Sequence, residues 1–365
     1  MPSGSLDHTE RLAGVQAHLA AAREPHASGP GADAASLRTA YLELLKLALC
    51  DLAGTSTISV GAVEDGTVVS RELRGDGRRL RAAGMDWPLQ GLTMVGLDRL
   101  DDLQACVESV VEDQIDGDVI EAGAWRGGAS MLMRATLDTL GDGRTVWVAD
   151  SFQGFPDDEA RDAGDLDLSA FDFLAAPLED VRGSFARLGL DRGVEFVPGF
   201  FAQTLPALTG RRWAIVRLDA DTYEPTRLAL ECLYPGLATG GYLIIDDYGS
   251  FEGCRRAVDE FRREHGITDP IERVDSTCSR WRRTSEAPPL EPAPAPARSA
   301  AVAPSSRSRD DLHVPSTHEV ELERQLRALS QRLAGAEKEI AHLESSPLRG
   351  PRAWARQRLG RRAAR

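Results

Sequence analysis

The chain has 365 residues, of which 42% are hydrophobic, and it carries a formal net charge of −14. This length is enough for one large α/β domain with attached segments, and no run of about 18 apolar residues predicts a membrane span. Residues 285–365 have a net charge of +4, so the first 284 residues are near −18. The negative charge of these 284 residues argues against binding of DNA or RNA over a broad surface.

The cysteines and the N-terminus both indicate a cytoplasmic protein. The five cysteines are scattered and form no C-x-x-C pair, so we expect them to be reduced and buried. The first residues show no basic stretch followed by an apolar run, and no secretory signal is predicted.

The N-terminal part divides into a leader and a helix. Residues 1–36 are rich in Ala, Gly, Pro and His without periodicity, and they are predicted to be a flexible leader. From residue 37 to residue 51 the apolar spacing predicts an amphipathic helix.

Strands and helices alternate from Asp118 onward. Apolar runs predict strands at 118–123, 145–150, 193–199, 213–220 and 241–248. Helices are predicted at 128–140, from about 225, and at 252–265. This alternation predicts a mostly parallel sheet covered on both faces. The segment after Pro270 predicts a short antiparallel hairpin at the sheet edge.

The sequence changes character after Thr284. Residues 285–316 are rich in Pro, Ala and Ser and predict an extended linker. Residues 317–345 carry an a/d heptad pattern that predicts a short coiled coil and hence a homo-oligomer; the alternative is a lone amphipathic helix packed on the main domain. Residues 346–365 contain seven arginines and no acid. They predict contact with an anionic membrane surface or an acidic partner, or else an unstructured tail.

The first predicted strand ends in a glycine-rich loop, E-A-G-A-W-R-G-G at 121–128. Gly123 permits a tight turn, but the loop is not G-x-G-x-x-G, so it favours a nucleoside without phosphates. Asp150, at the end of the second strand, is placed to accept hydrogen bonds from ribose hydroxyls. Glu121 could face the cationic amino acid portion of the same ligand. The alternative is a strand–helix turn with only a packing role.

Four aspartates follow the fourth and fifth predicted strands, namely Asp219, Asp221, Asp246 and Asp247. If these strands are neighbours, the carboxylates converge, repel one another and raise their own pKa values. A divalent cation resolves that conflict, and oxygen ligands suit Mg²⁺ or Mn²⁺ rather than zinc. The alternative is that Asp246 and Asp247 form a simple turn, with Asp219 and Asp221 capping the next helix.

Ordered sequence blocks from about Tyr41 to Thr284 resemble the macrocin O-methyltransferase family of sugar O-methyltransferases. The blocks are YLELLKLAL, DWPLQGLTMVGLDRLDDL, GDVIEAGAWRGGASMLMRA, ADSFQGFP, GFFAQTLP, RLDADTYEPT and GGYLIIDDYGSFEGCRRAVDEF. The resemblance implies a methyltransferase domain over residues 37–284 with the class I fold, a Rossmann-like, doubly wound, mostly parallel seven-stranded sheet, and a helical N-terminal lid. It also implies S-adenosylmethionine as the methyl donor and Mg²⁺ as an essential partner.

The resemblance assigns roles to individual residues. The donor site is similar at Glu121, Gly123, Asp150 and Ser151, covered by Thr93, Met94 and Val95. The metal ligands are similar at Asp219, Asp246 and Asp247, and Asp221 matches the proposed general base, with Asp219 also needed for turnover. The leader and all residues after Thr284 depart from the family, and VDSTCSRW is a loose match that puts acceptor contacts there in doubt.

The implied reaction is methyl transfer from S-adenosylmethionine to a sugar hydroxyl of a small-molecule or glycan acceptor. One alternative is a catechol-type O-methyltransferase, which needs the same metal but an aromatic-lined pocket. Another is a glycan-assembly scaffold with an inactive core, against which the intact carboxylates argue. A tethering tail would suit a polysaccharide acceptor better than a soluble antibiotic.

Overall fold

The computed structural model describes residues 11, 13–15, 17, 31–64, 67–155, 168 and 171–286. All of them belong to the first of two compact units, Met1–Ala297. The segments predicted as a linker beyond residue 286, a coiled coil and a basic tail lie outside the described residues, so these assignments, and the self-association and membrane contact expected from them, stay predictions. None of the described helices is both long and apolar enough to cross a membrane.

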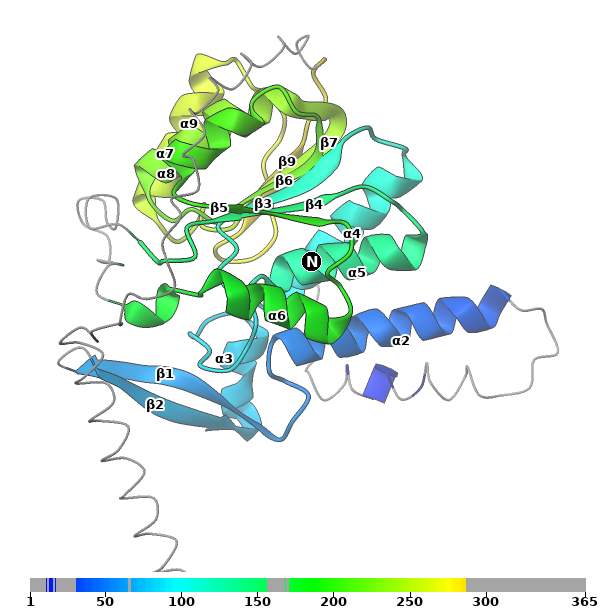
Figure 1. Cartoon of the computed structure of the whole chain (residues 1–365), viewed down its shortest axis with the longest axis vertical. Coiled ribbons are helices and arrows are strands. Elements are labelled where there is room, and N and C mark those ends of the chain that lie inside the picture. Colours follow the sequence, from blue (N-terminus) through cyan, green and yellow to red (C-terminus); the bar gives the residue numbers. More distant parts are fainter. Residues whose placement is uncertain are drawn as a thin grey trace, which may run out of the picture. The chain divides into compact units, whose positions relative to one another are not determined.

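A seven-stranded sheet forms the centre of the described domain (Figure 1). Its strands are β3 (Asp118–Ala122), β4 (Val146–Asp150), β5 (Val194–Pro198), β6 (Trp213–Leu218), β7 (Leu237–Ile245), β8 (Glu272–Arg273) and β9 (Ser279–Arg282). They lie in the order β5-β4-β3-β6-β7-β9-β8, with β3 to β7 parallel and β9 antiparallel to both β7 and β8. The predicted parallel sheet and its antiparallel edge hairpin are confirmed.

Helices cover both faces of the sheet, as the unbroken apolar strands require. The helices are α2 (Gly31–Leu49), α3 (Arg78–Ala82), α4 (Leu97–Glu112), α5 (Gly128–Leu140), α6 (Leu178–Leu188), α7 (Phe201–Thr204), α8 (Tyr223–Leu233) and α9 (Glu252–Glu264). In Figure 1, α7, α8 and α9 lie on one face, and α4, α5 and α6 lie on the other. Successive strand residues alternate between the two cores, with Val119 packing on the α4–α5 side and Ile120 on the α8–α9 side.

The N-terminal region differs from the expectation of a flexible leader followed by a helical lid. The helix α2 is present but begins at Gly31, inside the predicted leader. Arg11 also bonds to Asp101, and Val15 is 4% exposed. An ion pair and buried apolar area therefore hold part of the leader on the domain.

A two-stranded antiparallel hairpin, β1 (Ser56–Glu64) with β2 (Thr67–Arg74), was not predicted. It is attached to the following chain, because the backbone N–H of Val60 donates to Trp87 at 2.8 Å and that of Leu89 donates to Ile58 at 3.0 Å. The signal was available in the sequence as β-branched residues on both sides of an Asp-Gly pair.

The order of the strands reverses beside β3, since β4 lies on one side of it and β6 on the other. Open α/β sheets bind ligands outside the carboxyl ends of strands at such a point. Here Gly123 follows β3 with φ +91°, and a Cβ atom on it would overlap the carbonyl oxygen of Asp219. Glycine at 123 therefore allows the tips of β3 and β6 to meet.

Candidate active site

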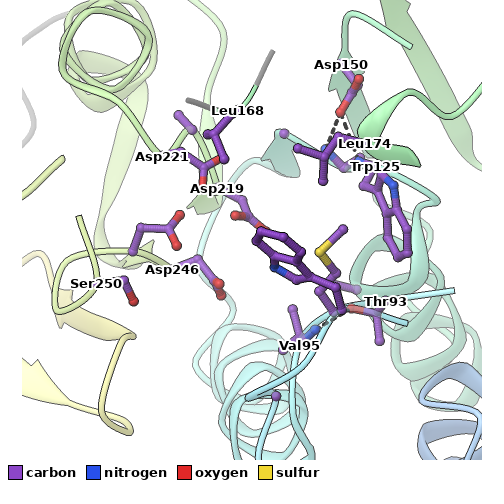
Figure 2. Close-up of a pocket in the computed structure, with 18 of the residues that line it drawn as sticks. Thr93, Val95, Trp125, Asp150, Leu168, Leu174, Asp219, Asp221, Asp246 and Ser250 are labelled. Carbon is purple, nitrogen blue, oxygen red and sulfur yellow. Dashed lines mark hydrogen bonds between the residues drawn. The ribbon is translucent and has the colours of Figure 1, made fainter. Parts of the chain in front are cut away.

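A cavity of about 540 Å³ opens at the carboxyl ends of the strands (Figure 2). The residues predicted for the donor, metal and catalytic sites all line it, namely Thr93, Met94, Val95, Glu121, Gly123, Asp150, Ser151, Asp219, Asp221, Asp246 and Asp247. The fold thus brings together side chains from positions 93 to 247 of the chain.

Asp150 closes the loop that follows β3. Its Oδ2 accepts hydrogen bonds from the backbone N–H groups of Ala124 and Trp125 at 2.8 and 2.9 Å, and its Oδ1 accepts one from Phe152 at 2.7 Å. Burial raises the pKa of Asp150, although these three donors oppose the rise. The carboxylate fixes the loop through three of its roughly four acceptor sites, and its bond to a ribose hydroxyl stays a prediction.

The Thr93–Val95 segment lies against the start of α5. The backbone N–H of Gly128 donates to Leu92 at 2.9 Å, and the Thr93 hydroxyl accepts from the N–H of Val95 at 3.1 Å. A Cβ on Gly128 would lie 2.6 Å from the Leu92 oxygen. The segment is therefore held tightly beside the glycine-rich loop, where the resemblance placed a donor cover. Ser151, beyond that loop, donates its hydroxyl hydrogen to Gly154 at 2.7 Å.

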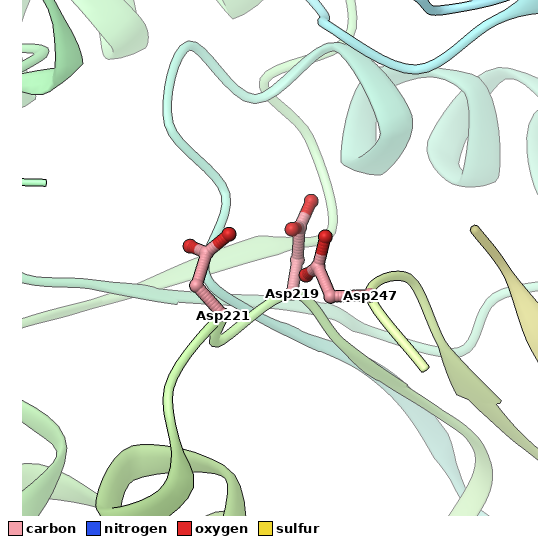
Figure 3. A group of neighbouring side chains, drawn as sticks. All are labelled: Asp219, Asp221 and Asp247. Carbon is pink, nitrogen blue, oxygen red and sulfur yellow. The ribbon is translucent and has the colours of Figure 1, made fainter. Parts of the chain in front are cut away.

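Three carboxylates converge above β6 and β7 (Figure 3). One oxygen from each of Asp219, Asp221 and Asp247 lies within 4.8 Å of the other two. Asp221 adopts φ 56°, a left-handed conformation that aspartate tolerates and that occurs often at functional turns.

Asp246 is held differently from its neighbours. One carboxylate oxygen bonds to Arg99 of α4 and the other to Arg217 of β6. Burial by itself raises its pKa, but Arg217 and Arg99 bring the pKa of Asp246 below its ordinary value. The resemblance placed Asp246 among the metal ligands, whereas its oxygens here are both engaged by guanidinium groups.

Arg217 is a buried cation shared by several acids. It bonds to Glu121 at 2.6 Å and to Asp219 at 2.9 Å in addition to Asp246. Burial raises the pKa of Glu121 to about 7, with Arg217 and the hydroxyl of Ser130 opposing the rise. Glu121 is thus an internal partner of Arg217 and Ser130, with a 2% exposed side chain.

The converging carboxylates have strongly raised proton affinities. Burial and then Asp219 raise the pKa of Asp221 well above its ordinary value, and burial and then Asp221 do the same for Asp247. Burial and then Asp246 raise the pKa of Asp219, despite Arg217. Clustered shifts of this kind are typical of functional sites.

The residues fit a hard divalent cation. Oδ2 of Asp247 is buried without a hydrogen-bond partner in the described part of the chain. An unpaired buried carboxylate beside two others is costly unless a positive charge compensates it. Oxygen ligands at this spacing suit Mg²⁺ or Mn²⁺.

The opposite wall of the cavity was predicted only at Thr93, Met94 and Val95. It is formed by the hairpin and by residues 84–95, with the ring of Trp87 packed against Phe171 and Phe173 at centroid distances of 4.9 and 5.4 Å. The buried arginines Arg99 and Arg217 were missed as well. An arginine inside the apolar strand WAIVRL was a usable signal, since it requires a buried partner.

Comparisons with known proteins agree on one family. Residues 37–283 match the family described as macrocin-O-methyltransferase (TylF). The chain is 46% identical to the 8-demethyl-8-(2,3-dimethoxy-alpha-L-rhamnosyl)-tetracenomycin-C 4'-O-methyltransferase of Streptomyces olivaceus, over 70% of this chain and 97% of that one. It is 40% identical to the mycinamicin III 3''-O-methyltransferase of Micromonospora griseorubida, over 67% and 96%. The solved structure of the O-methyltransferase NovP is similar with a TM-score of 0.59 and 38% identity, over 68% of this chain and all of NovP.

Proposed function

The chain belongs to the macrocin-O-methyltransferase family, and we propose that it methylates a hydroxyl group of a sugar with the help of a divalent cation. It is an S-adenosylmethionine-dependent O-methyltransferase by family. The observation that carries the proposal is the position of the carboxylates Asp219, Asp221 and Asp247 in the same cavity as the glycine-rich loop after β3. Donor and acceptor can therefore meet in one enclosed site.

The sugar acceptor is supported by the relatives. The printed names of two of them describe methylation at a 4' and at a 3'' position, and one of these names includes a rhamnosyl group. A sugar offers neighbouring hydroxyls, which suit a site where several carboxylates converge. We propose a glycosylated small molecule or a glycan as the acceptor.

Asp219 and Asp247 would hold the cation, because they belong both to the converging carboxylates and to the ligand set implied by the family resemblance. The third ligand is Asp221 by proximity or Asp246 by resemblance. When bound, Mg²⁺ supplies two effects: it fixes two acceptor oxygens and lowers the pKa of the attacking hydroxyl. Burial and Asp219 raise the pKa of Asp221, so its ionised carboxylate is a stronger base than an ordinary aspartate and suits a proton acceptor.

The remaining residues orient and shield the reactants. Gly123 lets the tip of β3 lie directly against Asp219, and Asp150 keeps the following loop in one conformation through its backbone bonds. Arg217 neutralises part of the carboxylate charge and fixes the direction of Glu121 and Asp246. The wall around Trp87 bounds the cavity on the hairpin side.

A phenolic acceptor is a second candidate. The cavity is lined by the aromatic side chains Trp87, Trp125, Phe155, Phe200, Phe201 and Phe251. Such a lining suits a catechol, whose two hydroxyls would use the same carboxylates. A panel of acceptors decides between the two candidates.

The test begins with calorimetric titration of S-adenosylmethionine and S-adenosylhomocysteine. Methyl transfer is then measured with a panel of p-nitrophenyl glycosides and catechol, each with Mg²⁺ and with EDTA. Transfer to a glycoside that EDTA abolishes supports the proposal, and transfer to catechol alone favours the second candidate. A folded protein that binds neither donor nor product contradicts the enzyme assignment.

A further inference from the structure

We propose that Arg99 is a positioning residue, which fixes the cavity wall of residues 84–95 to the carboxylates at the strand tips. The proposal rests on the proposed function, because this wall positions an acceptor only if the cavity binds one. Arg99 stands in the first turn of α4, and its side chain is 7% exposed in the cavity wall.

The Arg99 guanidinium joins three segments that are distant in the sequence. Nη1 bonds to Asp246 at the end of β7, and Nη2 donates to the carbonyl oxygen of Gly84 at 3.1 Å. Nε lies 3.0 Å from Oδ2 of Asp275, in the turn between β8 and β9, as an ion pair without hydrogen-bond geometry. Because guanidinium is planar and has several donors, these partners fix its orientation.

Asp275 is itself a rigid anchor. Its Oδ1 accepts hydrogen bonds from the backbone N–H groups of Thr277 and Cys278 at 2.8 and 2.7 Å, which leaves Oδ2 for Arg99. The neighbouring Ser276 hydroxyl lies 3.8 Å from the sulfur of Met85, so the same turn also meets the wall. The turn therefore supports both Arg99 and the start of the 84–95 segment.

Arg99 and Gly84 pack so closely that no side chain fits at position 84. Gly84 has φ +64°, and a Cβ on it would lie 2.5 Å from Nη2 of Arg99 and 2.5 Å from the backbone nitrogen of Gly96. A Cβ on Gly96 would likewise lie 2.5 Å from the carbonyl carbon of Ala83. Two glycines thus allow the chain before the wall to lie directly on the start of α4.

The position of this wall matters for an acceptor. The part of this segment next to Arg99 lines the cavity with Met85, Asp86 and Trp87. Thr93, Met94 and Val95, the donor cover, are held separately by the bond from Gly128 to Leu92. The hairpin is bonded to the backbone of Trp87, so its position depends on that of the wall. Arg99 sets the distance between this wall and Asp246, next to the carboxylates proposed to hold the cation. A misplacement of about 1 Å is enough to slow a reaction about 100-fold.

Arg99 also contributes a positive charge beside these acids. Its removal makes the carboxylate group more negative, so the affinity for a divalent cation does not fall through charge. Loss of acceptor use without loss of cation or product binding is therefore the signature of positioning. General damage to the fold would weaken all three.

The experiment compares Arg99→Met and Arg99→Lys with a matched control, Arg280→Met. Arg280 also joins α4 to the β8–β9 hairpin, through Asp102 at 2.8 Å and Glu272 at 2.9 Å, but it bonds to neither Asp246 nor Gly84. The probes are Mn²⁺ and S-adenosylhomocysteine for binding, and a p-nitrophenyl glycoside that the wild type methylates for kinetics.

For Arg99→Met we expect the acceptor KM to rise about tenfold or more and kcat/KM to fall about 100-fold, while Mn²⁺ and S-adenosylhomocysteine bind at least as tightly as to the wild type. The acceptor KM of Arg99→Lys should lie between those of the wild type and Arg99→Met, since lysine keeps the charge but lacks the several planar donors of a guanidinium group. Arg280→Met should change KM less than about twofold. Equal KM values for Arg99→Met and Arg280→Met overturn the proposal.

Asp275→Asn provides a test that does not depend on the folding of Arg99→Met. It weakens the anchor of Arg99 and leaves the turn intact, so we expect KM to rise about threefold with unchanged Mn²⁺ affinity. An unchanged KM contradicts the positioning role. A wild-type protein that binds S-adenosylhomocysteine but methylates no glycoside overturns the proposed function first, whereas normal wild-type turnover with an unaffected Arg99→Met overturns only the present proposal.

Discussion

The acids at the two ends of the parallel strands are held in opposite ways. The side of the sheet where these strands begin is its amino edge, and the side where they end is its carboxyl edge. At the amino edge, Asp118 accepts hydrogen bonds from the backbone of Thr145 and the indole N–H of Trp147, and Asp142 is bound by Arg144 through both oxygens. At the carboxyl edge, three aspartates converge, and among the described side chains only Arg217 forms an ion pair with one of them, Asp219. Acids that have partners stabilise the fold, whereas acids that crowd together without enough partners indicate a ligand-binding site.

The pKa directions express the same difference. Burial would raise the pKa of Asp142, but the bonds from Arg144 bring it below its ordinary value. At the other edge, the pKa values of Asp219, Asp221 and Asp247 all lie above theirs. A bound cation would therefore stabilise the ionised acids at the carboxyl edge, whereas the acids at the amino edge already have hydrogen-bond partners.

The largest effect should come from Asp219→Asn, which removes the carboxylate common to every proposed role. We expect kcat to fall about 1,000-fold or more, with S-adenosylhomocysteine binding within about threefold of wild type. Calorimetry and single-turnover kinetics measure the two quantities. Asp269→Asn is the control, because Asp269 is 5% exposed but lies outside the cavity and bonds to Thr284. Wild-type turnover of Asp219→Asn in metal-stripped buffer would show that the crowded acids do not hold a catalytic cation.

The next largest effect should be a pH dependence of the free energy of unfolding, caused by Glu121. Its folded pKa of about 7 lies above the ordinary value of 4.5, so its stabilising contribution is complete below pH 4.5 and is lost as the pH rises to about 7. From pH 5 to pH 8 the metal-free wild type should lose roughly 2–3 kcal/mol relative to Glu121→Gln. Urea unfolding in EDTA at both pH values measures this. Equal pH slopes for the two proteins would contradict the raised pKa.

A smaller effect distinguishes Asp221 from Asp246 as the third cation ligand. If proximity decides, Asp221→Asn weakens Mn²⁺ binding about 10- to 100-fold, and Asp246→Asn weakens it less than about threefold. The reason is that Asp246 already gives both oxygens to Arg99 and Arg217. Mn²⁺ titration followed by electron paramagnetic resonance measures both affinities. The reverse order would mean that Asp246 leaves an arginine when the cation binds, and that Asp221 is free to act as the base.

The fold of the catalytic domain was largely predictable from the sequence, because strands buried on both faces are continuous apolar runs. β3, β4, β5 and β6 begin and end within two residues of the predicted ranges, whereas β7 begins at Leu237 rather than at 241. The acids at the strand tips were also visible, since ligand positions in such sheets are fixed by topology.

The partners of these acids could not be predicted in the same way. Arg217 is 96 residues from Glu121 and 29 from Asp246, and its bonds depend on how β3, β6 and β7 are ordered in space. The resemblance therefore gave Asp246 a metal-binding role without showing that two arginines already bind it. The hairpin was missed for another reason: its Asp-Gly turn signal is present, but Gly61 interrupts the alternation of its first strand.

The smallest effect is expected at the amino edge, where Asp142→Asn should leave methyl transfer within about twofold of wild type. It should cost about 1 kcal/mol or less of stability, because the carboxylate is partly exposed and Arg144 keeps its bonds to the carbonyl oxygens of Ile115 and Gly117. Urea unfolding and steady-state kinetics on the same preparation give both numbers. A tenfold loss of kcat/KM at unchanged stability would place a functional acid at the amino edge and remove the contrast between the two edges. A loss of stability alone would show that Asp142 serves the fold through its bonds to Arg144. Converging carboxylates would then remain the feature that marks the edge where the ligands bind.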